Sequence, residues 1–214
     1  MLPEPSMLAP EYPAAVVGGD VKTSQAVTGA LYAALGVMAE GSGTMDNVTF
    51  GNERHQYYET VASRSGAGPG LDGTNVVQTH MANSRLNAPE VVLERRLPVL
   101  LESYAIRRGS GGAGRWRGDD GGVRRIRFHE SMTISLLTNH RRDPPYGMAG
   151  GEPGTLGRNS IERVGATVVE LAESDVAEVR TGGVLVVESP GGGGAGPSGA
   201  IVRSALIIER LRQD

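Results

Sequence analysis

The sequence predicts an α+β fold, with a mixed amino half that holds one long amphipathic helix and a mainly antiparallel β carboxy half with Gly-rich loops. Apolar residues recur every three or four positions early in the chain and every second position later in it. Between these periodic segments lie most of the 32 glycines of the 214-residue chain, which mark turns and loops. With 39% hydrophobic residues, the chain can bury a core.

The long helix is predicted to begin near Ser24 and to run to about Ala39. Asp20, Thr23 and Ser24 are residue types that cap the amino end of a helix. An apolar stripe follows at helical spacing, formed by Val27, Ala30, Leu31, Ala34, Leu35 and Met38. We expect this stripe to face the core.

Residues 41–60 lack a helical period and predict a loop and a short strand, in which Val48 and Phe50 share one face. A second, short helix is predicted from the segment APE at 88–90, because proline is favoured in the first turn. Pro98 ends this helix. The residues expected to point it at the core are Val91, Leu93 and Leu97.

The carboxy half shows the period of two that is typical of strands. Ile126 and Phe128 alternate with polar residues. After a polar break the alternation resumes at Met132, Ile134 and Leu136. Further strands are predicted at 99–107, 167–171, 176–179 and 184–188, separated by Gly-rich or charged turns.

Composition excludes several classes of function. The chain has no cysteine, which removes thiol nucleophiles, disulfides and thiolate-bound metals. Its net charge of -3 argues against a nucleic-acid or anionic-membrane surface, since such surfaces need clustered Lys and Arg. No apolar run approaches the roughly 20 residues of a membrane helix, and the amino terminus lacks a signal-peptide pattern. We expect a cytoplasmic protein.

None of the four histidines has the spacing of a helical metal pair or a zinc finger. His80, in the segment QTHMANSR, has amide, hydroxyl and guanidinium groups beside it. Its imidazole can donate to a substrate carbonyl or shuttle a proton. The alternative is a structural histidine that is hydrogen-bonded within a polar loop.

The segment YYET at 57–60 holds two phenols and a carboxylate. On a strand, Tyr57 and Glu59 lie on one face, and Tyr58 and Thr60 on the other. One of these faces can form a pocket wall. The alternative is that the tyrosines pack with satisfied hydroxyls.

The segment RRGSGGAGRWRGDDGG at 107–122 combines glycines and arginines, which bind anions through backbone N–H and guanidinium groups. It lacks the GxxxxGK[ST] pattern of a phosphate loop, and no helical period follows it. We predict a Gly-rich connection between strands, with arginines that form ion pairs or contact a partner chain. Trp116 anchors it by apolar contact.

Seven segments, in the same order, resemble the B-type subunit of the hydantoinase B/5-oxoprolinase family. They are GGDVKTSQ at 18–25, GTMDNVTFGN at 43–52, YYET, GLDGTNVVQTHMANSR at 70–85 with PEVVLE, RRGSGGAGRWRGDDG, PPYGMAGGEPG at 144–154 and SPGGGG at 189–194. The resemblance covers about residues 13–194. Asp46 departs from the amide expected beside Asn47, and the sequence after Gly194 departs from the family's ending.

The resemblance implies part of the B-type subunit of an ATP-dependent cyclic-amide hydrolase that opens a ring such as 5-oxoproline or hydantoin. In this family a hydantoinase A-type subunit uses ATP and Mg to phosphorylate the lactam oxygen, and the B-type part opens the activated ring with water. The family's divalent metal is expected in an upstream half of the B-type subunit, so we expect no metal in this chain. The implied partners are the A-type subunit, that upstream half and the small cyclic-amide substrate.

Such a reaction needs donors for the developing oxygen charge and a base that orients water. The candidate catalytic residues are His80, Glu59 and Tyr57, and the candidate substrate-binding residues are Asn47, Tyr58, Asn83 and Arg85. Two alternatives stay open: a subunit fragment of an ATP-dependent acetone/acetophenone-type carboxylase, and a non-catalytic scaffold or relic fragment. Because the upstream half is absent, we expect no hydrolase activity from this chain alone.

Three segments are predicted along the chain. Residues 1–12 form an irregular lead-in, residues 13–196 form the carboxy-terminal part of a hydantoinase B/oxoprolinase-type domain, and residues 197–214 form a divergent tail. Apolar residues in the tail predict a short amphipathic helix, at Ile201, Leu206, Ile207 and Leu211.

Overall fold

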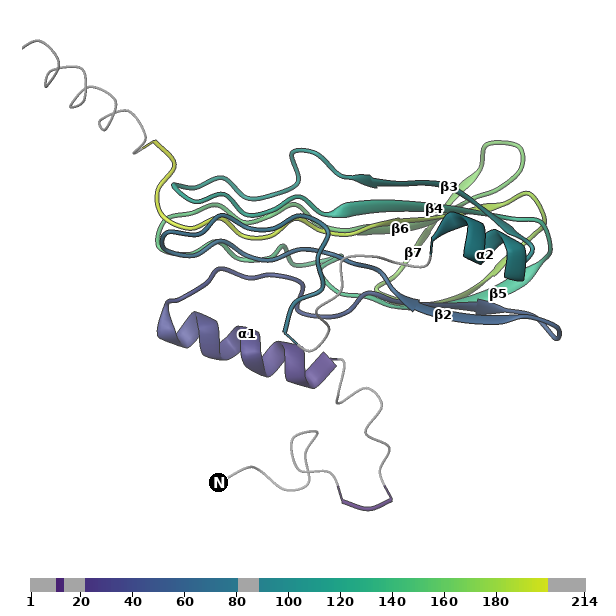
Figure 1. Ribbon diagram of the computed structural model, residues 1–214, viewed down its shortest axis with the longest axis horizontal. Coiled ribbons are helices and arrows are strands. Elements are labelled where there is room, and N and C mark those ends of the chain that lie inside the picture. Colours follow the sequence, from purple (N-terminus) through teal and green to yellow (C-terminus); the bar gives the residue numbers. More distant parts are fainter. Residues whose placement is uncertain (1–10, 14–21, 81–88, 200–214) are drawn as a thin grey trace, which may run out of the picture.

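The computed structural model describes residues 11–13, 22–80 and 89–199, and its main body is a sandwich of two antiparallel sheets (Figure 1). One sheet has the order β2-β1-β5-β8 and the other the order β3-β4-β9-β6-β7. The strands are β1 Asn47–Gly51, β2 Gln56–Thr60, β3 Val99–Ile106, β4 Gly122–Phe128, β5 Met132–Leu137, β6 Arg158–Glu162, β7 Val168–Leu171, β8 Ser174–Val179 and β9 Val184–Glu188.

The core lies between the two sheets and is built by alternation along the strands. In β5, Met132, Ile134 and Leu136 are buried while the residues between them are exposed. Phe50 of β1 meets Phe128 of β4 edge to face, with ring centroids 5.1 Å apart. Full burial of each such side chain contributes about 1.5–3 kcal/mol. The α+β class and the antiparallel carboxy half are therefore confirmed.

Strand β6, Arg158–Glu162, was not predicted because polar residues occupy its centre. Asn159 is buried there, and its Nδ2 donates to Thr138 Oγ1 at 3.0 Å. Its Oδ1 accepts a bond from Arg141 Nη2 at 2.8 Å. These partners replace water for the buried amide, so a strand without an apolar pattern fits the sheet interior.

The short helix α2, Glu90–Arg96, lies beside the sandwich as the sequence predicts (Figure 1). Leu93 and Leu97 are buried in the core, but Val91 is exposed, so the prediction for that residue is wrong. Glu94 fastens the helix to the neighbouring strand by accepting a hydrogen bond from the backbone N–H of Leu101 at 2.9 Å.

The long helix is shorter than predicted, and its apolar stripe faces solvent rather than the core. Helix α1 spans Ser24–Leu35 and ends at Gly36, whose left-handed backbone closes the last turn. Its only buried residue is Gln25. The apolar stripe expected to face the core is exposed instead, with 56% of Leu31 and 72% of Leu35 accessible. A helical period identifies an apolar face but does not specify what covers it.

The Gly-rich segments form a second structural unit at one end of the sandwich (Figure 1). Extended segments at 37–42, 64–68, 110–119 and 145–155 surround a central segment at 191–194, and we call this unit the glycine bundle. The N–H groups of residues 191 to 194 donate in turn, at 2.9–3.1 Å, to the carbonyls of Thr155, Asp119, Glu40 and Glu152.

The first and fourth of these donors reach the same neighbouring segment, so the pattern repeats after three residues. Three residues per turn is the period of a polyproline II helix, which has no internal hydrogen bonds and offers its backbone groups to neighbours. Only glycine allows such close approach: a Cβ on Gly191 would lie 1.8 Å from Ser110 O, and one on Gly193 would lie 1.9 Å from Tyr146 O.

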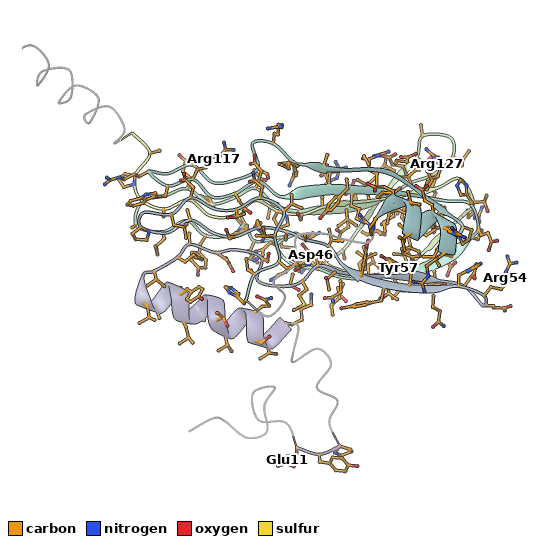
Figure 2. The ribbon with its side chains drawn as sticks, viewed as in Figure 1. Glu11, Asp46, Arg54, Tyr57, Arg117 and Arg127 are labelled. Atoms are coloured by element: carbon orange, nitrogen blue, oxygen red, sulfur yellow. The ribbon has the colours of Figure 1, made fainter. Side chains whose placement is uncertain are left out.

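The Gly-rich connection at 107–122 joins β3 to β4, as predicted. Two of its four arginines form ion pairs, Arg117 with Asp120 at 3.1 Å and Arg107 with Glu188 at 3.8 Å. Figure 2 shows Arg117 at the bundle end of the molecule and Asp46 where the bundle meets the sandwich. No helix among the described residues is long and apolar enough to cross a membrane. The predicted tail helix lies outside the described residues.

Candidate functional site

The predicted site residues fall into three separate places. Tyr57 and Glu59 point between the two sheets, where Glu59 forms a two-pronged ion pair with Arg124 at 2.7 and 2.9 Å. The Tyr57 hydroxyl donates to Glu59 at 3.0 Å, and the Arg124 guanidinium lies over the ring of Tyr104. Both charges of the pair are buried. Burial also raises the pKa of the Tyr57 hydroxyl, which keeps it a donor.

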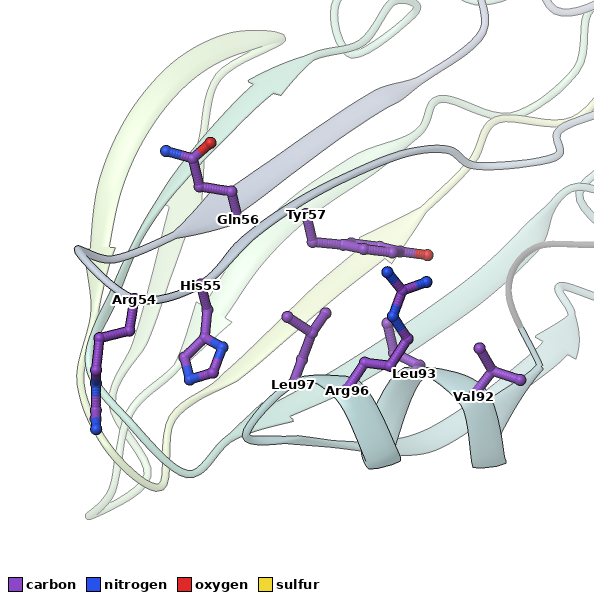
Figure 3. A pocket seen from close by; sticks show the side chains of 8 residues that line it. All are labelled: Arg54, His55, Gln56, Tyr57, Val92, Leu93, Arg96 and Leu97. Atoms are coloured by element: carbon purple, nitrogen blue, oxygen red, sulfur yellow. The ribbon is translucent and has the colours of Figure 1, made fainter.

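The Tyr57 ring also lines a cavity of about 260 Å³ between β2 and α2 (Figure 3). Apolar residues of α2, including Leu93, form one wall of this Tyr57 cavity, and Arg54 and Arg96 are its charged members. Arg54 is paired with Glu130 at 2.7 Å. No carboxylate lines the cavity, so its described lining contains no acidic group that could act as a base.

Asn47 and Tyr58 lie on the opposite, outer face of the same sheet. The two residues form a hydrogen bond from Asn47 Nδ2 to the Tyr58 hydroxyl. Asn47 is buried, whereas Tyr58 is exposed. They therefore do not face the same space as Tyr57 and Glu59. Asn83 and Arg85 lie outside the described residues.

His80 lies in a different cavity, which we call the His80 pocket, between α1 and the glycine bundle. Its volume is about 230 Å³. Small residues of α1 form one side, and polar residues from distant parts of the chain form the other. The polar lining residues are Gln25, Glu40, His80, Asn139 and Tyr146. This cavity joins a predicted catalytic residue, His80, to a carboxylate, Glu40.

Local backbone strain accompanies the His80 pocket. His80 has φ 63° and His140, which follows the pocket residue Asn139, has φ 59°. For residues other than glycine this conformation costs about 1–3 kcal/mol, and such residues cluster at functional sites. Gly43 lines the same pocket, and a Cβ there would lie 2.9 Å from His140 Nε2. The sequence therefore keeps glycine where the imidazole must approach.

Glu40 presents an ionised carboxylate to the pocket. Burial raises the pKa of Glu40, but the hydrogen bond and charge of His140 and the Tyr146 backbone N–H outweigh it and lower the pKa below 4.5. His140 Nε2 is 3.3 Å from Glu40 Oε1, and its Nδ1 donates to the Asp143 carbonyl at 2.9 Å.

His80 and Tyr146 complement this carboxylate with groups that are neutral at pH 7. Burial lowers the pKa of the His80 imidazole below its ordinary value of 6.5. The ring of His80 packs edge to face on Tyr32 of α1, with centroids 5.3 Å apart. Burial, and then the charge of Glu40, raise the pKa of the Tyr146 hydroxyl. The pocket thus offers an ionised base, a neutral imidazole and a hydroxyl.

A buried ionic cluster lies between this pocket and the sandwich. Asp46 accepts hydrogen bonds from Arg141 at 2.9 Å and from Ser63 at 3.1 Å, and it is fully buried. Lys22 bonds to Thr44 and to the Leu137 carbonyl. Burial, opposed by Asp46, lowers the pKa of Lys22 to about 8. The buried Asp46 carboxylate is therefore matched by the cations Arg141 and Lys22.

Sequence reasoning named His80 as a candidate but did not name Glu40, Asn139 and Tyr146, which line the same cavity. These residues converge only in three dimensions. The segment PPYG around Tyr146 was the one available signal, through its resemblance to the family. Within the described residues, no group of three or more His, Asp or Glu side chains is placed to hold a metal ion.

Comparison with known proteins places this architecture. The sequence matches the family described as hydantoinase B/oxoprolinase over residues 1–198. It is 37% identical to the 5-oxoprolinase of Dictyostelium discoideum, over 94% of this chain and 16% of that protein. It is 41% identical to 5-oxoprolinase 1 of Arabidopsis thaliana, over 91% of this chain and 15% of that protein. The chain therefore spans about a sixth of these relatives.

Two solved structures share the fold. The ATP-dependent caprolactamase from Pseudomonas jessenii superposes with a TM-score of 0.64 at 19% identity, over 83% of this chain and 33% of that chain. A nucleotide-free acetone carboxylase gives a TM-score of 0.62 at 16% identity, over 81% of this chain and 28% of that chain. With the sequence match over almost the whole length, they lead to one conclusion: this chain belongs to the hydantoinase B/oxoprolinase family.

Proposed function

We propose that this chain supplies part of the B-type portion of an ATP-dependent enzyme that hydrolyses a cyclic amide, with 5-oxoproline as the first candidate substrate. The observation that carries this proposal is the His80 pocket. An ionised carboxylate and a neutral imidazole line this one cavity, in a chain 37% and 41% identical to 5-oxoprolinases. An A-type subunit that uses ATP and Mg is the proposed partner, and the cytoplasm is the proposed location.

The size and lining of the His80 pocket suit a small cyclic amide. Pockets for drug-sized ligands measure about 300–1,000 Å³, so a cavity of about 230 Å³ accommodates a ring of a few heavy atoms. The Asn139 amide can donate to a ring carbonyl, and the small residues Gly29 and Ala33 of α1 leave room for the ring. Mixed donors and acceptors match the amide group of such a substrate.

The chemistry of the pocket residues follows from their charge states. An unstrained amide resists water, and ATP supplies the phosphoryl group that makes the lactam oxygen a leaving group. Water must then add to the activated carbon while losing a proton. Glu40 is ionised and can orient that water and accept one proton from it. The neutral His80 can accept the second proton and, as the imidazolium, transfer it to the ring nitrogen as the C–N bond breaks. The acyl phosphate that results then releases phosphate to a second water.

In this proposal Tyr57 and Glu59 lie outside the His80 pocket and do not contact the substrate. Their network with Arg124 fixes β2 against the opposite sheet, and we assign it to holding the fold rather than to contact with the substrate. Asn47 and Tyr58 remain candidates for binding on the outer face of the sheet. Asn83 and Arg85 follow His80 in sequence, and we propose them as further substrate-binding residues.

The test is a reconstituted enzyme that contains this chain, the remaining B-type polypeptide and the A-type polypeptide. With ATP and 5-oxoproline, His80→Gln and Glu40→Gln should each lower kcat about 10²- to 10⁴-fold, the usual contribution of a general acid or base. The melting temperature should fall little. His129→Gln, at an exposed histidine, is the matched control.

The outcomes separate the alternatives. Turnover of acetone or acetophenone with bicarbonate, and none of 5-oxoproline, would replace the hydrolase by the carboxylase. A fully active assembly in which both substitutions are silent would make this chain a non-catalytic scaffold. Equal losses of activity and of folding would make His80 structural.

A further inference from the structure

Helix α1 presents its apolar side to solvent. Val27, Leu31 and Leu35 are 40%, 56% and 72% exposed, and Val37 continues the surface beyond the helix at 47%. Val27, Leu31 and Ala34 lie on one side at helical spacing, so the exposed residues are contiguous rather than scattered. We call this surface the α1 apolar face. A contiguous apolar surface of this kind marks an interaction site.

The opposite side of α1 already has its partners. Gln25 Nε2 donates to the Thr79 carbonyl at 2.7 Å, and the Tyr146 hydroxyl donates to the Gly29 carbonyl at 3.3 Å. Gly29 and Ala33 line the His80 pocket. The helix therefore rests on the body through small and polar residues. Its larger apolar residues point away, which is the reverse of an ordinary surface helix.

The absence of charge along α1 indicates the kind of surface that the α1 apolar face suits. The segment SQAVTGALYAAL at 24–35 contains no charged residue, and none occurs at 36–39 either. Anionic membranes and nucleic acids are recognised through Lys and Arg, so an uncharged face does not suit them. It suits a dry, apolar protein surface. A helix of 12 residues is also marginal by itself in water, so covering this face would stabilise it.

The lengths of the relatives point to the protein segment that covers the α1 apolar face. This chain corresponds to 33% of the caprolactamase chain with the same fold, and to 16% of the Dictyostelium discoideum 5-oxoprolinase. Most of each relative therefore consists of residues with no counterpart here. We propose that the α1 apolar face is the surface on which the remaining part of the hydantoinase B-type polypeptide docks. This inference rests on family membership and fold, and is independent of the proposed reaction.

Docking at this face also has a consequence for the His80 pocket. One side of α1 would contact the remaining B-type part, and the other side already forms a wall of the pocket through Gly29 and Ala33. Because a helix is a rigid element, fixing its outer side fixes its inner side. The docked part would hold the pocket wall in place without supplying a residue to it.

A photo-crosslinking experiment tests the occupant directly. A benzophenone amino acid replaces Leu31 in this chain, which is co-expressed with the remaining B-type polypeptide and the A-type polypeptide, and the crosslinked peptides are identified by mass spectrometry. We expect crosslinks to the B-type polypeptide. The same group at Val176, an exposed residue on β8 at 67%, is the control and should give none to that surface. Crosslinks to a second copy of this chain, to the A-type polypeptide, or to nothing would overturn the proposal.

A binding measurement supplies the second arm. Leu31→Asp should weaken association with the B-type polypeptide at least tenfold, while Val176→Asp should leave it unchanged. Both positions are exposed, so both variants should keep the melting temperature of the parent. Unchanged association of Leu31→Asp would refute the docking face. Since association is read without turnover, an enzyme inactive on 5-oxoproline would leave this result intact.

Discussion

Gly193→Ala should be among the most damaging single-methyl additions to this chain. The new Cβ would lie 1.9 Å from the Tyr146 carbonyl oxygen and 2.7 Å from its carbon, and a Cβ contact below 3.0 Å forces something to move. The atoms in the way are backbone. Moving the segment strains the bonds from the Gly193 N–H to Glu40 and from the Ala67 N–H to Gly193. Overpacking costs about 1–3 kcal/mol and each weakened hydrogen bond about 1 kcal/mol. We expect a loss of about 3–5 kcal/mol.

Urea unfolding, followed by circular dichroism, measures this loss as a lower midpoint at constant slope. Gly29→Ala is the matched control, because a Cβ at Gly29 meets nothing within 4 Å and the position is helical. That variant should be neutral or more stable by up to about 1 kcal/mol. If Gly193→Ala unfolds at the same urea concentration as the parent, the close-packed glycine bundle is wrong. If both variants lose stability equally, the effect belongs to added methyl groups in general.

Three further predictions concern charged groups. Glu59→Gln should cost about 3–5 kcal/mol in urea unfolding, because it leaves the buried Arg124 without its counter-charge; a loss below 1 kcal/mol would show that the pair is hydrated. The pKa of Lys22 is about 8 in the folded chain and 10.5 ordinarily. Between these pH values the unfolded chain binds more protons than the folded chain, so the contribution of Lys22 to the free energy of unfolding rises with pH. Relative to Lys22→Met, the parent should therefore gain stability from pH 8 to pH 10, and parallel pH curves would contradict the assignment. Arg117 is committed to Asp120, so titration of this chain with a fluorescent ATP analogue should show no saturable micromolar binding; binding abolished by Arg117→Ala would move the nucleotide site into this chain.

The strands were predictable because their signal is local. Alternation at Met132, Ile134 and Leu136 identifies a half-buried strand without reference to any other segment. The same reasoning failed for β6, where Asn159 is buried and forms hydrogen bonds to Thr138 and Arg141. A polar residue looks exposed to a pattern analysis unless its distant partners are known.

Helix α1 and the His80 pocket show the other limit of sequence reasoning. The stripe containing Leu31 and Leu35 was recognised, but a helical period does not specify whether that stripe faces the core or the solvent. Glu40 and Tyr146 are 106 positions apart and meet through two hydrogen bonds, one from the Tyr146 N–H to Glu40 Oε2 and one from the Glu40 N–H to the Tyr146 carbonyl, both at 3.1 Å. Nothing at either position alone marks it as part of a pocket.

The glycine bundle and the His80 pocket are parts of one structure. The Gly193 N–H donates to the Glu40 carbonyl at 2.9 Å, and the Glu40 N–H donates to the Tyr146 carbonyl at 3.1 Å. The missing Cβ of Gly193 is what lets the Tyr146 backbone approach. The central segment therefore fixes the backbones of two pocket residues, and Gly193→Ala should displace both. Glycine, usually associated with freedom of the chain, here provides rigidity, because its lack of a side chain lets neighbouring backbones bond on several sides. The Gly-rich motifs that carry the family resemblance then have a physical role: they hold the backbones of Glu40 and Tyr146 in place at the His80 pocket.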